Sequence, residues 1–535
     1  ASMAVPGVFA PARLDGRLLV DGGVTNNLPM DVAREMGAQV LIVVDISTPL
    51  KGAEEISDVF AVTDQLTSIM TRANTERQLA TLTSADVQIV PLIPDVTTGD
   101  FKRLAEAIPA GYEAASLERS SISRYAVGDA EYRAWVASRE RRGRVPTIDF
   151  IEIVNDAGLA QEALMINVGH PLGEPLDTAQ LERDVARIYG TELFERVTPE
   201  VVDRDGVSGI VIDARAKSWG PNYLQFGMDM EDDFEGDTLY NIRVAYLQTV
   251  RTLRGAEWRT AITVGQEPGI LTEWYQPIDR VRRYFVNASV RYQKFNLNQY
   301  EGDDRVAEYR FTETGGEIAA GRVFGNWGEI RVGYEGGTGD TSLRVGDPTL
   351  PTPDFDLGRM FVGFTVDTLD NGYFPTDGGY MQATYSWHRS GFGDDESFDQ
   401  AALEGGVALS WGRYTIIPSV ELGKSTRGDT PFYALFRAGG FLRLSGFESD
   451  ELSGQDLALG RAVFYRRMND ITFLPVYVGG SLEYGAIGDD IDEDDGKAAG
   501  SLFLGADSFF GPLYLGAGFA EGGNASAYMF LGQRF

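Results

Sequence analysis

The sequence predicts a multidomain protein that ends in a 16-stranded antiparallel transmembrane β-barrel, and three observations lead to this fold class. Residues 1–140 alternate apolar strand signals with helical patterns, which is typical of a partial α/β domain. Residues 145–216 read as a small β-α-α-β-β unit. In residues 220–535 helical periodicity stops, and period-two alternation repeats in about 16 segments.

In the α/β region, two β-branched apolar runs predict strands that are buried on both faces, VLIVVDI at 40–46 and VQIVPLI at 87–93. RLLV at 17–20 predicts a shorter strand. Helical patterns occupy four further segments, at 29–38, 53–83, 101–118 and 130–142. Buried strands that alternate with helices predict a mainly parallel sheet covered by helices.

The second region begins with a strand signal, TIDFIEIV at 147–154. Two helical patterns follow at 159–166 and 178–190. Two β-rich runs, at 194–202 and 208–216, then flank the turn sequence DRDG and predict a hairpin.

The third region alternates apolar and polar side chains strictly. In YFVNASVRYQ at 284–293, one face carries Tyr284, Val286, Ala288, Val290 and Tyr292, and the other carries Asn287, Ser289, Arg291 and Gln293. Most segments are long enough for a tilted strand to cross a bilayer. Short turns alternate with longer acidic loops, as in outer-membrane barrels. A soluble β-sandwich or propeller is the alternative, but the strands are unusually numerous and equal, and blade repeats are not evident.

Composition excludes several classes of function. The net charge of −32, from 47 basic and 79 acidic residues, argues against nucleic-acid binding. The absence of cysteine excludes disulfides and thiolate metal sites. Only two histidines occur, His170 and His388, which nearly excludes a multi-histidine metal site or a histidine-based triad. We therefore predict no metal and no cofactor.

The stretch LLVDGGVTNNLP at 18–29 is the candidate for chemistry. Asp21 ends an apolar run, the pair Gly22 and Gly23 permits a tight turn, and Asn26 and Asn27 could hydrogen-bond the turn and hold the carboxylate. A carboxylate can serve as the base that activates a serine hydroxyl. The structural alternative is a simple turn, which is the obvious interpretation of the same tripeptide at 377–379, between two barrel strands.

The first region resembles the C-terminal part of a patatin-like phospholipase. ASMAVPGVFAP at 1–11, LVDGGVTNNLPMDVAREMGAQVLIVVDIS at 19–47 and the helical tail through Gly111 carry the resemblance. It implies that Asp21 is the catalytic base and that the nucleophile is the serine of an upstream G-x-S-x-G elbow. That motif is absent from the 535 residues, and neither Ser2 nor Ser47 sits on a glycine elbow. We therefore expect the chain to lack its N-terminal part and to be inactive alone.

The second region resembles a POTRA domain through three features. These are Gly169-x-Pro171-Leu172, the pattern of Asp177, Leu181 and Asp184, and the run IYGTELFERV. The resemblance implies a periplasmic module that binds extended chains at a sheet edge.

The barrel region is similar to the 16-stranded barrels of the outer-membrane assembly and two-partner secretion superfamily. Residues 364–380 match a turn-and-strand signature, and residues 436–460 resemble the loop that folds back into the lumen. The resemblance implies that Arg443 pairs with an acid on a later strand, for which Glu483 is our candidate; alternatively, Arg443 merely lines a wet lumen. The terminal Phe535 is the expected insertion signal for the barrel-assembly machinery.

The three regions together resemble the type Vd secreted phospholipases of Gram-negative bacteria. The resemblance implies an outer-membrane lipid acyl hydrolase, with phospholipid as substrate, the lipid bilayer as partner and a homodimer as a suggested state. Two alternatives stay open: a protein translocation or assembly barrel with an inactive patatin remnant, and an anchored scaffold without activity.

Overall fold

The computed structural model describes most of the chain. The described residues are 11–14, 17–47, 59–93, 105–140, 145–232, 234, 238–302, 304–468, 474–491, 495–508 and 510–532. The chain divides into two compact units, 1–144 and 145–535. Each unit is described by itself.

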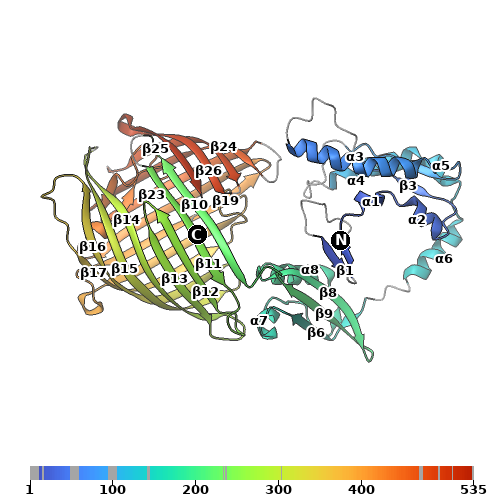
Figure 1. The fold of residues 1–535 in the computed structure, drawn as a ribbon, viewed down its shortest axis with the longest axis horizontal. Coiled ribbons are helices and arrows are strands. Elements are labelled where there is room, and N and C mark those ends of the chain that lie inside the picture. Colours follow the sequence, from blue (N-terminus) through green and yellow to red (C-terminus); the bar gives the residue numbers. More distant parts are fainter. Residues whose placement is uncertain are drawn as a thin grey trace. The chain divides into compact units, whose positions relative to one another are not determined.

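The first unit contains two short β-ladders and several helices, drawn in blue and cyan in Figure 1. β1 (Ala12–Leu14) pairs antiparallel with β2 (Arg17–Leu19), and β3 (Ile42–Val44) pairs parallel with β4 (Val87–Ile89). The helices are α1 (Gly23–Asn26), α2 (Met30–Glu35), α3 (Val59–Leu79), α4 (Ala107–Leu117), α5 (Arg119–Ser123) and α6 (Asp129–Glu140). Among the helices in the described part of the chain, none combines the length and apolar character that a membrane span requires.

Burial corrects one expectation for this unit. The run at 40–46 was predicted to be buried on both faces, but only one face of β3 is covered. Val43 is buried with Met30 and Leu41, whereas Ile42 and Val44 are about half exposed, at 52% and 49%. Because side chains alternate across a strand, a single layer of helices buries every second residue.

The second unit begins with a small α/β module. A three-stranded sheet has the order β6-β9-β8, in which β6 runs parallel and β8 antiparallel to β9. Its elements are β5 (Thr147–Ile148), β6 (Phe150–Asn155), α7 (Gln161–Met165), β7 (Glu174–Pro175), α8 (Thr178–Tyr189), β8 (Phe194–Arg204) and β9 (Val207–Ala216). The order of strand, two helices and hairpin is the one predicted, with a short β5–β7 ladder in addition.

The core and the caps explain why this module folds. Ile188 of α8 and Phe194, Ile210 and Ile212 of the sheet are all fully buried in one cluster. The side chain of Asp177 accepts a hydrogen bond from the backbone N–H of Gln180, which satisfies a donor at the start of α8.

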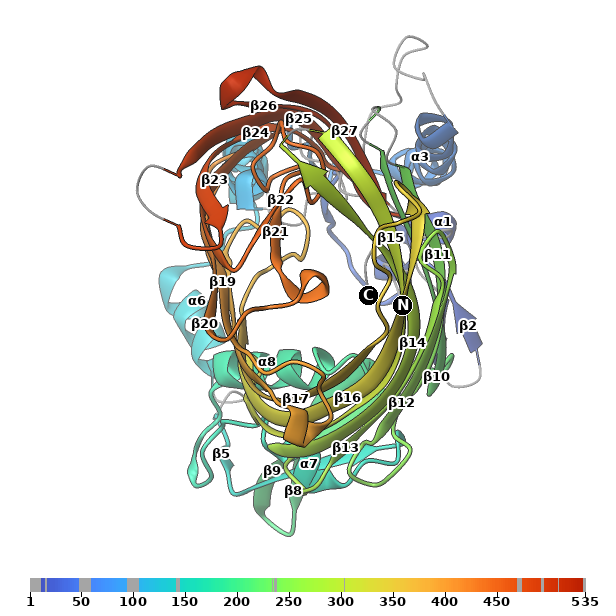
Figure 2. The same cartoon turned by 90° about the vertical axis from the view of Figure 1, so that its left-hand side faces the viewer.

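The rest of the second unit is a closed barrel of 16 strands, as the alternation predicted (Figures 1 and 2). Consecutive strands pair antiparallel throughout, and β10 pairs with β27 to close the barrel. The strands are β10 (Asn222–Asp232), β11 (Thr238–Gln248), β12 (Glu257–Gly265), β13 (Gly269–Pro277), β14 (Tyr284–Glu301), β15 (Asp304–Phe324), β16 (Gly328–Val345), β17 (Phe355–Asp367), β18 (Gly378–His388), β19 (Asp399–Trp411), β20 (Tyr414–Arg427), β23 (Asp456–Arg467), β24 (Val476–Gly488), β25 (Lys497–Ser508), β26 (Gly511–Ala520) and β27 (Ala525–Gly532).

The two faces of the barrel wall differ in character. Apolar side chains such as Leu224, Phe226 and Ile242 are exposed on the outside, whereas their neighbours Asp229 and Asn241 are buried inside. Asn241 donates a hydrogen bond to Asp229 across the β10–β11 pair. An apolar outer face and a polar lumen are what a bilayer requires of a barrel.

Few of the described strand pairs belong to the ladder that closes the barrel. β10 and β27 share four paired positions, Asp229–Gly532 to Asp232–Met529, although β10 has 11 residues. The predicted C-terminal signal, Phe535, lies outside the described residues. The ladder that closes the barrel is therefore the one with the fewest described pairs.

The long connection between β20 and β23 returns into the barrel. It contains a two-stranded ladder, β21 (Phe436–Ala438) with β22 (Leu452–Gly454), that is separate from the wall. Figure 2 shows this segment, drawn in orange, within the ring of strands. Residues 436–460 therefore contain the predicted lumen loop.

Candidate functional site

Asp21 lies in the turn between β2 and α1. Its Oδ1 accepts a hydrogen bond of 2.7 Å from the backbone N–H of Gly23. A Cβ at position 23 would lie 2.9 Å from that oxygen and 3.0 Å from the Oδ1 of Asn27, so any larger residue there would require both side chains to shift. The second oxygen, Oδ2, accepts no hydrogen bond from the described residues and is available to accept a proton.

The two asparagines stabilise the helices rather than the carboxylate. Asn26 donates to the Oδ1 of Asp31, at 2.9 Å. Asn27 donates to the hydroxyl of Thr75, which lies buried on α3, at 3.4 Å. The expectation that these side chains hold Asp21 is corrected: they lie at the C-terminal end of α1 and connect it to Asp31 of α2 and Thr75 of α3.

A second acid, Asp86, fixes the start of β3 and the start of β4. Its carboxylate accepts hydrogen bonds from the backbone N–H groups of Thr83 and Leu41 and makes a bidentate ion pair with Arg34, at 2.7 and 2.6 Å. The Thr83 N–H, with these other donors, holds the pKa of Asp86 well below its usual range. Asp86 is structural, because all its lone pairs face protein donors.

The tip of the lumen loop corrects a predicted ion pair. Arg443 pairs with Glu421 on β20, with Nη2–Oε1 at 2.7 Å and Nε–Oε2 at 3.3 Å, and not with Glu483. Leu442 and Leu444 both have positive φ, 65° and 67°, so the chain turns sharply on either side of Arg443. This turn directs the arginine to β20 and brings Ser445, two residues further on, over Glu483.

Glu483 anchors the tip through Ser445. The two carboxylate oxygens accept 2.8 Å hydrogen bonds from the backbone N–H and the hydroxyl of Ser445. The Tyr528 hydroxyl on β27 accepts from the N–H of Gly446 and donates to the carbonyl of Phe447. The tip is therefore attached to β20, β24 and β27, which includes one strand of the closing ladder.

A second insertion into the lumen comes from the β17–β18 connection. Phe374 is 1% exposed and stacks on Tyr477 with ring centroids 4.1 Å apart. Tyr465 and Tyr514 surround it, and their hydroxyls donate to the carbonyls of Pro375 and Tyr373. We call Phe374 with these three tyrosines the aromatic clasp. It lies within the signature at 364–380, and the packing explains why that turn needs an aromatic residue.

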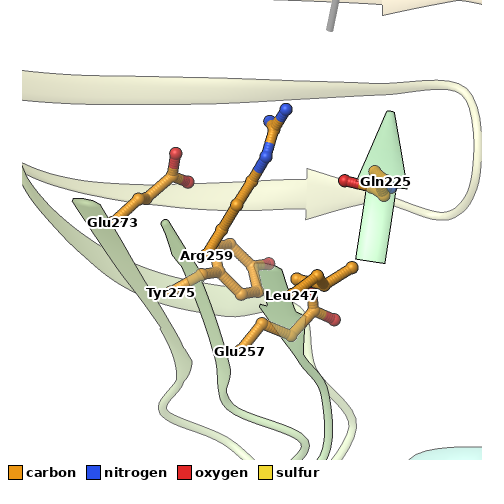
Figure 3. A pocket seen from close by; sticks show the side chains of 6 residues that line it. All are labelled: Gln225, Leu247, Glu257, Arg259, Glu273 and Tyr275. Carbon is orange, nitrogen blue, oxygen red and sulfur yellow. The ribbon is translucent and has the colours of Figure 1, made fainter. Parts of the chain in front are cut away.

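The opposite wall of the lumen is charged. Arg291 pairs with Glu313 and Glu335, and Arg359 pairs with Glu335 at 2.6 Å. Nearer the α/β module, a hollow of about 300 Å³ is lined by side chains of β10 to β13, among them Glu257, Arg259, Glu273 and Tyr275 (Figure 3). Sequence reasoning did not single these residues out, although the period-two alternation places them on the inner face.

Two protein families match this chain, one in the barrel and one at the start of the first unit. Residues 254–504 match the Omp85 superfamily domain, and residues 1–34 match the patatin-like phospholipase family. Patatin-like phospholipase domain-containing protein 7 of Rattus norvegicus is 52% identical over 50 residues, which are 9% of this chain and 4% of that protein. The chain thus spans a small fraction of the curated relative it matches.

Two solved structures share the barrel architecture. BamA from Haemophilus ducreyi, in a form lacking POTRA domains 1–3, aligns with a TM-score of 0.53 and 15% identity over 74% of this chain and 85% of its own. CdiB from Escherichia coli aligns with a TM-score of 0.51 and 12% identity over 93% of this chain and 90% of its own. The chain therefore combines a patatin-like N-terminal segment with an Omp85-type barrel, which is the architecture of a Gram-negative outer-membrane protein.

Proposed function

We propose that the chain is the C-terminal part of an outer-membrane lipid acyl hydrolase of phospholipase A type, carried by its own barrel. The observation that supports this best is the Asp21 turn, in which the backbone holds one carboxylate oxygen and the other accepts no hydrogen bond from the part of the chain that the structure describes. We infer that residues 145–216 form a POTRA domain on the periplasmic side.

The proposed chemistry is acyl transfer by a serine and aspartate pair. A serine outside these 535 residues attacks the ester carbonyl, and Asp21 takes the serine proton as the new bond forms. The oxyanion receives backbone hydrogen bonds, the ester bond breaks, and the proton passes to the departing alcohol. Water then hydrolyses the acyl-enzyme with the same carboxylate as base.

The chain carries its own control for this assignment. Asp377 begins the second D-G-G sequence, in the β17–β18 connection of the barrel. In the complete protein, embedded in phospholipid vesicles, we expect Asp21→Ala to lower fatty-acid release by about 10²–10⁴-fold. Asp377→Ala should leave release unchanged. Release that survives Asp21→Ala would refute the role of Asp21.

A second candidate is protein translocation or assembly by the barrel, with an inactive patatin remnant. The match of residues 254–504 to the Omp85 superfamily domain supports it, because the barrel is the part of the chain on which that similarity falls. Two results together would replace the hydrolase by this candidate. The complete protein would leave lipid intact, and deletion of the protein would remove a separate secreted polypeptide from the medium.

A further inference from the structure

A cavity of about 380 Å³ opens at the barrel end farther from the α/β module, and none of the functions above uses it. Its lining comes from β14 to the start of β17, from the β16–β17 and β18–β19 connections, and from residues 431–433, which precede β21 in the connection between β20 and β23. Tyr309, Phe311 and Phe355 belong to the buried core of this end, and Phe432 and Tyr433 pack against them from the loop. These strand residues lie on the inner face, so the cavity faces the lumen rather than the lipid.

The lining is mainly aromatic. The rings of Phe355 and Tyr433 stack with centroids 4.2 Å apart, and those of Tyr309 and Phe432 meet edge to face at 5.7 Å. Arg437, which does not line the cavity, already places its guanidinium 4.6 Å from the centroid of the Phe432 ring. A cation therefore already packs against the face of one ring of this cluster.

Negative charge surrounds these rings. Asp354, Asp395 and Glu396 line the cavity, and none of the described lining residues is basic. Asp395 is fixed in place because its Oδ2 accepts a 2.7 Å hydrogen bond from the backbone N–H of Asp356. The pKa of the Tyr433 phenol lies above its usual value, since burial and the nearby carboxylates both disfavour the phenolate. The local field therefore favours a positively charged occupant.

We propose that this cavity binds a small water-soluble organic cation of the quaternary-ammonium class. The aromatic rings and the carboxylates of Asp354 and Glu396 hold the ammonium group. This site is independent of the proposed hydrolase function, because the cavity shares no residue with the Asp21 turn.

The test is calorimetric titration of the detergent-solubilised protein with choline chloride at constant ionic strength. We expect saturable binding, and binding weaker by about tenfold or more for 3,3-dimethylbutan-1-ol, the uncharged molecule of the same shape. Absence of saturable choline binding, or equal binding of the uncharged molecule, overturns the proposal.

Variants locate the site. Glu396→Gln and Tyr433→Leu should each weaken choline binding by about tenfold. The control is Glu521→Gln, which removes an exposed acid from another connection at the same barrel end and should leave choline binding unchanged. Choline binding that is unchanged in both Glu396→Gln and Tyr433→Leu places the ligand elsewhere and overturns the assignment. Heat-modifiable migration in electrophoresis verifies that each variant retains its barrel.

Discussion

The aromatic clasp makes a quantitative prediction about how the barrel is stabilised. Phe374→Ala removes a ring that is 1% exposed and in contact with three tyrosines. Burial of a phenylalanine side chain contributes about 1.5–3 kcal/mol, and its aromatic pairs add about 0.5–1.5 kcal/mol. With the cavity that remains, we expect the free energy of unfolding to fall by about 3–5 kcal/mol.

Gly505 on β25 supplies the second half of the experiment. A Cβ there would lie 2.8 Å from the Phe374 ring, so Gly505→Ala alone should cost about 1–3 kcal/mol by overpacking. In the Phe374→Ala background the added methyl group enters the vacated space, and the cost should largely vanish. The assay is equilibrium denaturation of the four proteins in detergent, followed by intrinsic fluorescence. Additive costs, with no coupling energy between the two positions, would show that the clasp is not packed as described.

Three further predictions concern the lumen loop and the first unit. In denaturation experiments, a double-mutant cycle of Arg443→Ala and Glu421→Gln should give a coupling energy of about 1 kcal/mol. A cycle of Arg443→Ala and Glu483→Gln should give almost none. The reverse result would restore the Arg443–Glu483 pair expected from the sequence. Glu483→Gln alone should lower the free energy of unfolding by about 1.5–3 kcal/mol, because it weakens two hydrogen bonds from Ser445 to a charged acceptor. An unchanged denaturation midpoint would contradict the anchoring of the loop tip by Glu483. The pKa of Asp86 is lowered on folding, so its stabilisation of the first unit is present above the unfolded value of 3.8 and is lost as the pH falls towards the folded pKa. In urea titrations of the complete chain at several pH values, Asp86→Asn should therefore remove this part of the acid sensitivity. An unaltered pH profile would argue against this role of Asp86.

Much of the barrel followed from the sequence because its signal is repetitive. Each strand alternates apolar and polar residues, and the same bilayer selects the outer face of all of them, so the 16 strands were predicted. The position of the lumen loop followed from its resemblance to related barrels.

The contacts at the tip of the lumen loop could not be predicted from the sequence, because the backbone conformation decides them. The positive φ angles at Leu442 and Leu444 redirect Arg443 to β20 and bring Ser445 to Glu483. Similarly, the run at 40–46 looked fully buried because apolar content alone does not reveal how many helical layers cover a strand. The aromatic cavity was missed for another reason: its walls come from segments more than 100 residues apart, such as Tyr309 and Tyr433.

The most direct test of the account is covalent labelling of the complete protein with a fluorophosphonate lipid analogue, followed by intact-mass measurement. The account predicts one adduct per chain, on a serine outside these 535 residues, and loss of that adduct in Asp21→Asn with the Asp377→Asn protein labelled normally. No adduct on the unmodified protein, or an adduct that forms equally well in Asp21→Asn, would contradict the assignment of Asp21 as the base of a lipid acyl hydrolase.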